Sequence, residues 1–250
     1  MAELLVLGSG AGYPGGTRLP TTLAIKAGGR LYLLDCGAPA ATLLAWAGER
    51  LDTLEALFLS HLHPDHAGGV PLLMQSLLIS ERARPFATLV PPRSAERLAG
   101  AARALLVEPE RYPFAWQLAE ANLLETYAFP DLTVAFLPNA HLAGHWGLEP
   151  PVAASLYLSV EGSTVLYSGD VAQPEELASH VRMSDLLVHE LGHHEPEAVL
   201  DFAARYDVPR LAFVHLHPRW EGREDELRRL ARGRYAGELI VPRDGARVAI

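Results

Sequence analysis

Three histidines and an aspartate lie within six residues, directly after an apolar run, in the segment FLSHLHPDHAGG. Alternate side chains of an extended segment point to the same side, so His61 and His63 are expected to project together. Pro64 then turns the chain and brings Asp65 and His66 to a neighbouring point. Two imidazoles at one point, with a carboxylate and an imidazole at the other, suit two neighbouring divalent cations. The alternative, surface histidines ahead of a helix capped by Asp65, accounts for the aspartate but not for three histidines at this spacing.

Further candidate ligands follow apolar runs in three other segments, AFLPNAHLAGH, VLYSGD and LAFVHLHP. In the first segment His141 follows the run, and His145 comes shortly after it. In the second, Asp170 ends the run, and its two carboxylate oxygens can bridge two cations. In the third, His215 ends the run and His217 follows as an alternative. Each of these residues alone is typical of an ordinary loop, but beside the first cluster each becomes a candidate ligand.

Short β-type runs alternate with helical patterns along the chain. Strands are predicted at residues 3–7, 21–27, 30–35, 54–60, 87–90, 132–138, 153–160, 164–170, 185–189, 210–215 and as a pair within 238–250. Helices are predicted at 67–80, 94–106, 114–121, 174–182, 196–206 and 223–232. The dipeptide Gly28-Gly29 and the tripeptide EGS predict hairpin turns. Strands with helices between and outside them predict a layered α/β fold, and we expect one domain over residues 1–250 because no Ser/Gly linker occurs.

Composition narrows the classes of function. The formal net charge of −9 at pH 7 disfavours a broad nucleic-acid surface, which needs a positive field. The start MAELLVLGSG lacks the basic and long apolar segments of a signal peptide, and no apolar run is long enough to predict a membrane span. Cys36 is the only cysteine, so a reducing cytoplasm is the expected location. These features favour a cytoplasmic protein that acts on a small molecule and has no membrane partner.

Six segments of this chain together resemble one known family. They are LGSGAGYPGGTR, LLDCG, HLHPDHAGGVPLLMQSLL, LYSGD, SDLLVHE and LAFVHLHPRW. In this order, and over nearly the whole chain, they are similar to the metallo-β-lactamase-fold hydrolases, and within that superfamily to the ribonuclease Z and arylsulfatase-like branch. The resemblance implies a four-layered αββα sandwich with the site along one edge of the paired sheets.

The resemblance also implies a dinuclear metal centre. One metal would be held by His61, His63 and His141, the other by Asp65, His66 and His215, with Asp170 bridging the two. Two divalent ions are therefore expected as cofactors, zinc first, with manganese and iron as alternatives. The choices of His141 over His145 and of His215 over His217 remain open to test.

The implied chemistry is hydrolysis. Two cations that share a water lower its pKa, hold hydroxide as the nucleophile, and offset charge on the scissile phosphoryl or acyl oxygen. Asp65 is expected to take part in catalysis as well as in metal binding. In the segment HELGHHEP, the family's spacing implies His193 as the proton donor, with His194 as the alternative. The structural alternative is a polar helix start, with Glu195 and Pro196 in its first turn and both histidines merely solvated.

Three functions follow for a chain of this kind. We expect a phosphodiesterase or esterase that acts on a small molecule, with sulfate esters, lactones and thioesters as further substrates to test. The alternative is a tRNA 3′-processing endoribonuclease, and the third hypothesis is an iron-dependent oxygenase or redox protein on the same fold. The chain lacks the long Gly- and basic-rich arm with which a ribonuclease Z would grip tRNA, and HELGHHEP lacks the threonine-bearing motif of tRNA-processing members. The substrate and the oligomeric state, a homodimer included, are left open by the sequence.

Overall fold

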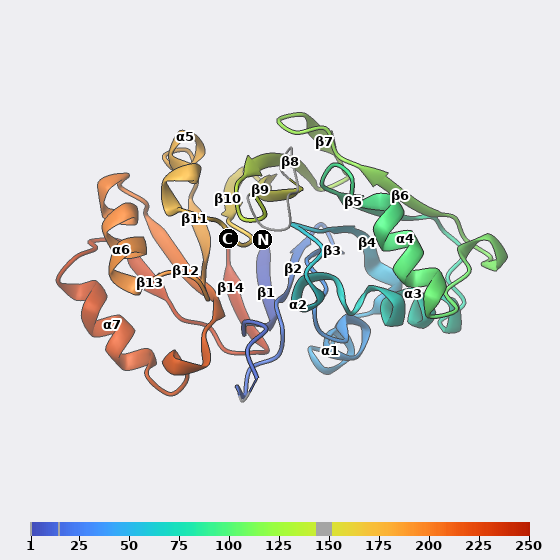
Figure 1. Ribbon diagram of the computed structural model, residues 1–250, viewed down its shortest axis with the longest axis horizontal. Helices are drawn as coiled ribbons and strands as arrows, with labels where there is room; N and C mark the ends of the chain where they lie inside the picture. Colours follow the sequence, from blue (N-terminus) through green and yellow to red (C-terminus); the bar gives the residue numbers. More distant parts are fainter. Residues whose placement is uncertain (1, 15, 144–151) are drawn as a thin grey trace.

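The computed structural model describes residues 2–14, 16–143 and 152–250, which form two mixed seven-stranded β-sheets (Figure 1). The first sheet has the strand order β14 (Ala246–Ala249), β1 (Glu3–Gly8), β2 (Thr22–Ala27), β3 (Arg30–Leu34), β4 (Leu54–Phe58), β5 (Phe86–Val90) and β6 (Trp116–Glu120). The second sheet has the order β13 (Glu238–Ile240), β12 (Arg210–Leu216), β11 (Leu186–Leu191), β10 (Ser163–Tyr167), β9 (Ala153–Val160), β8 (Leu132–Asn139) and β7 (Thr126–Ala128).

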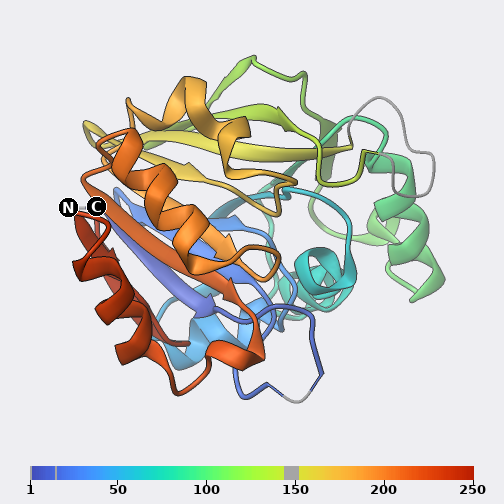
Figure 2. The same cartoon turned by 60° about the vertical axis from the view of Figure 1, so that its left-hand side comes forward.

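Helices cover the outer face of each sheet, which confirms the predicted αββα arrangement (Figures 1 and 2). Against the first sheet pack α1 (Ala40–Trp46), α3 (Val70–Ile79) and α4 (Ala95–Ala104). Against the second pack α5 (Ala178–Val181), α6 (Pro196–Arg205) and α7 (Glu224–Arg232). Shorter helical segments are α2 (Pro64–Ala67) and the 3₁₀ turns η1 (Leu51–Thr53), η2 (Pro109–Arg111), η3 (Pro174–Leu177) and η4 (Pro218–Trp220).

Strand β1 shows why the apolar runs are uninterrupted. Leu4 and Val6 point into the core between the two sheets, whereas Leu5 and Leu7 point into the core beneath the helices of the first sheet. Because successive side chains of a strand face opposite sides, a strand covered on both faces must be apolar at every position. The predicted turns are also confirmed, since Gly28 and Gly29 join β2 and β3 with positive φ angles of 54° and 80°.

Two secondary-structure predictions were wrong. The helix predicted at 114–121 is strand β6, which pairs in parallel with β5 at the edge of the first sheet. There the indole nitrogen of Trp116 donates to Thr88 Oγ1 at 2.9 Å, so pairing with a neighbouring strand outweighs the local preference for helix. The two final strands do not pair with each other: β13 pairs with β12 in one sheet, and β14 pairs with β1 in the other.

The strands that carry the candidate ligands end at one edge of the sandwich. β10, β11 and β12 run parallel to one another, and β4 lies parallel to β3 and β5 in the facing sheet. The loops that follow these strands therefore meet, as do loops at the carboxyl ends of parallel strands in general. Among the described residues, no helix is long and apolar enough to cross a membrane.

Candidate metal centre

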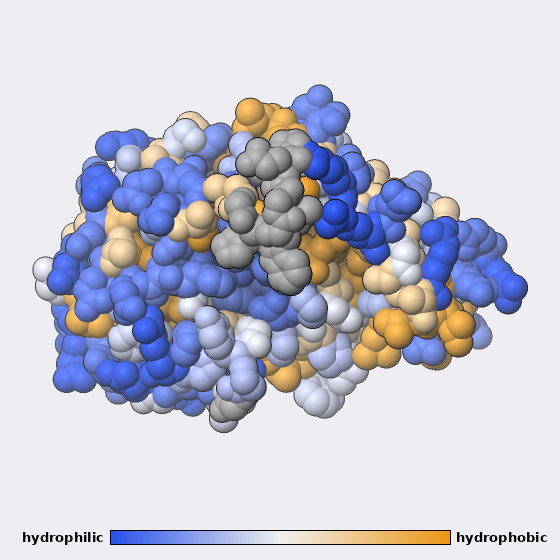
Figure 3. Space-filling view, viewed as in Figure 1, coloured by the Kyte–Doolittle hydropathy of each residue, from blue (hydrophilic) through white to orange (hydrophobic). Residues whose placement is uncertain are grey.

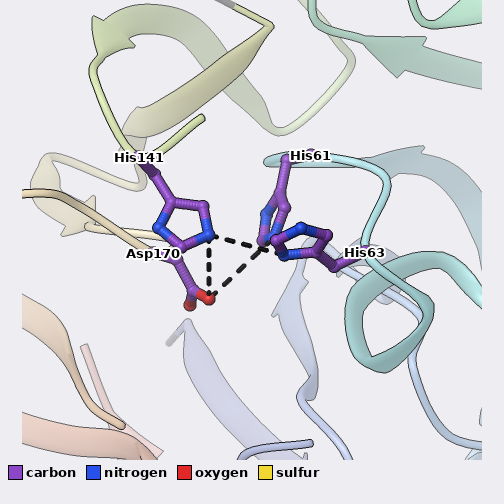
Figure 4. Close-up of side chains that lie close together, drawn as sticks. All are labelled: His61, His63, His141 and Asp170. Atoms are coloured by element: carbon purple, nitrogen blue, oxygen red, sulfur yellow. Dashed lines mark hydrogen bonds and ion pairs between the residues drawn. The ribbon is translucent and has the colours of Figure 1, made fainter. Parts of the chain in front are cut away.

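The structure brings all seven predicted ligands together at this edge, in two main groups of donor atoms. One group contains His61, His63, His141 and Asp170, and the other contains Asp65, His66 and His215. A further set of donor atoms, from Asp170, His193 and His215, overlaps both groups. Within each group the donor atoms lie within 4.8 Å of one another. Figure 4 shows the imidazoles and the carboxylate of the first group pointing toward one another, His61 and His63 from one loop and His141 and Asp170 from others.

Asp170 lies between the two groups. Its Oδ2 is 3.6 Å from Nε2 of His141 in the first group and 3.5 Å from Nε2 of His215 in the second. Its Oδ1 is 3.3 Å from Nε2 of His66. A carboxylate placed in this way can contribute an oxygen to each of two cations.

Two buried polar atoms at this point, Nε2 of His66 and Oδ1 of Asp170, lie 3.3 Å apart, but the geometry between them is not that of a hydrogen bond, and neither has another hydrogen-bond partner among the described residues. Leaving a buried polar atom unpaired costs about 1–3 kcal/mol, so native structures rarely tolerate it without a ligand. Imidazole and carboxylate donors in this proportion match zinc and its neighbours among the divalent metals. The residues present therefore fit a pair of divalent cations.

Asp35 organises the first-sheet side of the cluster. Its buried carboxylate accepts from Ser60 N, Ser60 Oγ and His66 Nδ1, each at 2.7 Å, and from the Tyr167 hydroxyl at 2.6 Å. Because Nδ1 of His66 is bonded to Asp35, its Nε2 faces the centre. Sequence reasoning missed this role of Asp35. The signal was a lone carboxylate directly after the apolar strand in LLDCG.

Hydroxyl groups orient two further imidazoles. The Ser60 hydroxyl gives its proton to Asp35, so it accepts from Nδ1 of His61 at 3.1 Å. The Thr21 hydroxyl donates to the carbonyl of Gly10, so it accepts from Nδ1 of His215 at 2.8 Å. Both arrangements leave Nε2 unprotonated and facing the centre, as metal-ligating histidines require.

Burial and charge tune the protonation of the cluster. Burial lowers the pKa of His61, His63 and His215 below its usual value, and it lowers that of His141 to about 4. Burial therefore favours the neutral form of these imidazoles, which is the form that binds metal.

The charges within the cluster act in the opposite direction on two groups. Burial alone would lower the pKa of His66, but the carboxylates of Asp170 and Asp35 outweigh it and raise that pKa well above its usual value. Burial alone would raise the pKa of Asp170, but His215 and His66 hold it well below its usual range. Asp170 is therefore an anion at neutral pH.

Glycines let the loops approach one another here. A Cβ on Gly12, in the Gly-rich first loop, would lie 2.6 Å from Oδ2 of Asp65. A Cβ on Gly192 would lie 2.5 Å from the ring of His215. Real Cβ atoms do not come so close, so only glycine leaves room for these two side chains.

The histidine pair in HELGHHEP contacts one buried carboxylate, that of Glu190. His193 Nδ1 lies 3.2 Å from Glu190 Oε1 and 3.7 Å from Asp170 Oδ2, and 37% of its side chain is exposed. His194 Nε2 lies 3.2 Å from Glu190 Oε1 and 3.1 Å from the carbonyl of Val171. The hydrogen bond to Glu190 raises the pKa of His193. Of the two, His193 borders Asp170, while His194 turns toward the backbone.

The alternative ligands lie elsewhere. His217 Nδ1 accepts the amide of Arg219 at 3.1 Å, and its ring packs on Tyr13 with 4.2 Å between centroids. It does not join either donor group of the described residues. His145, the alternative to His141, lies outside the described residues. A cleft of about 430 Å³ opens over the cluster, lined by His63, Ala140, His141, Leu142, Ala143, Val171, Ala172, Gln173, His193 and His194.

Comparisons with known proteins agree with this architecture. Residues 15–236 match the family described as the metallo-beta-lactamase superfamily, so the chain belongs to that superfamily. It is 25% identical to a ribonuclease Z of Pseudomonas putida (strain KT2440), over 97% of this chain and 95% of that protein.

Two solved structures show the same fold. The metallo-beta-lactamase fold protein YhfI from Bacillus subtilis superposes with a TM-score of 0.80 at 18% identity, over 99% of this chain and 98% of that one. Zn²⁺-bound PqqB from Methylobacterium extorquens superposes with a TM-score of 0.78 at 16% identity, over 99% of this chain and all of that one.

Proposed function

We propose that this protein is a metal-dependent hydrolase of small phosphodiesters or esters, with two divalent cations held by the seven clustered ligands. The observation that carries the proposal is the pair of His/Asp donor groups that share Asp170 in a member of this superfamily. When bound, such a cation pair generates a nucleophile from water near neutral pH and offsets charge on the reacting phosphoryl or acyl oxygen. Zinc is favoured because imidazole nitrogens dominate the donor set and because the similar PqqB structure is described as Zn²⁺-bound.

Two residues of the site have further roles in this proposal. His193 uses Nδ1 to bind Glu190, and its pKa is raised, so its ring can hold a proton near neutral pH and deliver it to the leaving oxygen. Asp65 keeps 21% of its side chain exposed beside His66 and His215, which lets it orient the attacking water as well as bind metal.

A phosphodiester is the favoured reacting group because the relative from Pseudomonas putida is named ribonuclease Z. That name also supports tRNA 3′ processing as a second candidate function. Two observations weigh against it for this chain. The net charge is −9, and the alignment to that relative runs over 305 positions, more than the 250 residues here, so the relative has segments without a counterpart in this protein.

The test begins with elemental analysis of the purified protein, in which we expect two zinc ions per chain. Hydrolysis of bis(p-nitrophenyl) phosphate should then disappear on chelation and return with Zn²⁺ or Mn²⁺. Asp170→Asn should abolish turnover, whereas the exposed, ion-paired Asp225→Asn should not change it.

Three outcomes would contradict the proposal. A protein that binds neither metal has no dinuclear centre, and a metal-loaded protein silent toward phosphodiester, ester and lactone panels is not this hydrolase. Salt-sensitive cleavage of precursor tRNA would favour the endoribonuclease, and an iron-loaded protein that consumes O₂ would favour the oxygenase.

A further inference from the structure

A second cavity, of about 260 Å³, opens next to the metal cluster. It is lined by Leu62, His63, Arg93, Ser94, Arg97, Leu142 and Val152. His63 and Leu142 also line the cleft over the cluster, so the two hollows adjoin. An apolar cavity of about 150 Å³ is enough to hold a benzene ring. The space beside His63 therefore accepts an apolar group of about that size.

The two arginines of this cavity are unusual for this chain. Arg93 and Arg97 are exposed, and neither has a hydrogen-bond or ion-pair partner among the described residues. Most other arginines are paired, as Arg84 is with Glu55 and Arg234 with Asp201. In a protein with an excess of nine negative charges, two guanidinium groups that line one cavity and form no ion pair with a described carboxylate are available to an external anion.

The backbone beside this cavity has an uncommon conformation. Arg93 has a φ of 64°, in the left-handed region that non-glycine residues rarely adopt, and such strain often accompanies a functional position. The next residue, Ser94, is only 2% exposed, and its hydroxyl does not cap α4 or bond any other described group. The backbone amide of Ala95, in the first turn of α4, donates to the carboxylate of Glu120. This amide is therefore not available to an anion, and the proposed site consists of side chains.

Resting on the proposed function, we infer that this cavity selects the substrate. The group next to the scissile bond is a small apolar moiety, such as a phenyl ring, that contacts Leu62, Leu142 and Val152. Beyond it the substrate carries a second oxyanion, a carboxylate or a phosphate, that pairs with Arg93 and Arg97 at the rim. The space-filling view shows strongly hydrophilic groups beside apolar ones on the face that carries β5 and α4 (Figure 3). The substrate class is thus an aryl or alkyl phosphodiester or ester that carries an additional carboxylate or phosphate group.

The test compares p-nitrophenyl phosphodiesters whose second ester group is phenyl, 4-carboxyphenyl or 4-phosphophenyl. We expect kcat/KM to be about tenfold higher for the two oxyanion-bearing esters, the ratio expected of one charge-assisted hydrogen bond. The preference should decline as salt is raised, because exposed charges are screened. The carboxylated and phosphorylated arms show which oxyanion is preferred.

The double variant Arg93→Gln/Arg97→Gln should bring that ratio close to one. Arg232→Gln is the matched control, because Arg232 is also exposed and without a partner among the described residues, but it lies in the last turn of α7, away from the site (Figure 1). A wild-type ratio near one, or a ratio that persists in the double variant, overturns the inference.

Binding separates this inference from the proposed function. Calorimetry on the metal-loaded protein with phenylphosphonate and 4-carboxyphenylphosphonate needs no turnover. Suppose that none of the three diesters is hydrolysed, but 4-carboxyphenylphosphonate binds about tenfold tighter than phenylphosphonate to the wild type and not to the double variant. The hydrolase proposal then fails and the cavity assignment stands. Equal binding of the two phosphonates to the wild-type protein would contradict the cavity assignment.

Discussion

The tetrapeptide HLHP occurs at residues 61–64, after β4, and again at 215–218, where β12 ends. In the first copy both histidines, His61 and His63, point into the metal-binding cluster. In the second copy only His215 does so, while His217 packs on Tyr13. The same four residues therefore place two candidate ligands after a strand of one sheet and one at the end of a strand of the other.

The difference does not arise at the second histidine's backbone. His63 and His217 have similar angles, φ −60° and ψ 146° against φ −62° and ψ 138°, and each precedes a proline that starts a helical turn. What differs is the surroundings: the His217 ring accepts the amide of Arg219, and the His63 ring caps nothing. At the first histidine, His215 has a φ of 48° beside a register shift between β11 and β12. Neighbours, and not the motif, decide which ring enters the site.

The largest expected effects come from the first copy. His61→Ala and His63→Ala should each lower kcat/KM about a thousandfold, since each removes a donor from a metal worth several kcal/mol of transition-state stabilisation. Elemental analysis and bis(p-nitrophenyl) phosphate hydrolysis measure the effect. A variant that kept both metals and full activity would remove that residue from the ligand set.

The second copy should respond asymmetrically. His215→Ala should lose activity on the same scale, while His217→Ala, which removes only a surface contact, should stay within about twofold of wild type. The same two assays, run on this pair, test the comparison directly. If His217→Ala lost metal while His215→Ala kept its metal and its activity, His217 would replace His215 in the ligand set.

The residues that support the rings differ between the two sides. Asp35→Asn, which weakens a carboxylate with four donors, should lower metal affinity about 100-fold, and Thr21→Val, which removes one hydroxyl behind His215, about tenfold. Competition with a fluorescent zinc chelator gives both affinities. Equal losses would mean that the two imidazoles are supported equally.

The smallest effect is a shift in pH dependence. Glu190 raises the pKa of His193, so the protonated donor persists to higher pH, and activity falls as pH rises through that pKa. Glu190→Gln removes the anion and should move the alkaline limb of the kcat–pH profile to lower pH. Glu195→Gln, which alters an exposed ion pair with Arg219, is the control. An unmoved limb in a folded Glu190→Gln protein would exclude His193 as the donor.

Local sequence was sufficient for the four candidate ligands that follow β4 and for much of the layering. His61, His63, Asp65 and His66 are close in the chain, so strand alternation and one proline place them without distant help. The uninterrupted apolar runs likewise predicted strands buried on both faces. The motif order then led to His141, Asp170 and His215, which composition alone could not separate from ordinary loop residues.

Tertiary structure decided the rest, because the deciding contacts join distant parts of the chain. Sequence reasoning missed Thr21 behind His215 and Tyr167 on Asp35, which are separated by 194 and 132 residues respectively. It also predicted helix where Trp116 pairs with β5, since helix propensity is local whereas strand pairing needs a partner already in place. The chain by itself determined which chemical groups are present and where most of the strands begin. Packing of the two sheets determined which of those groups face one another.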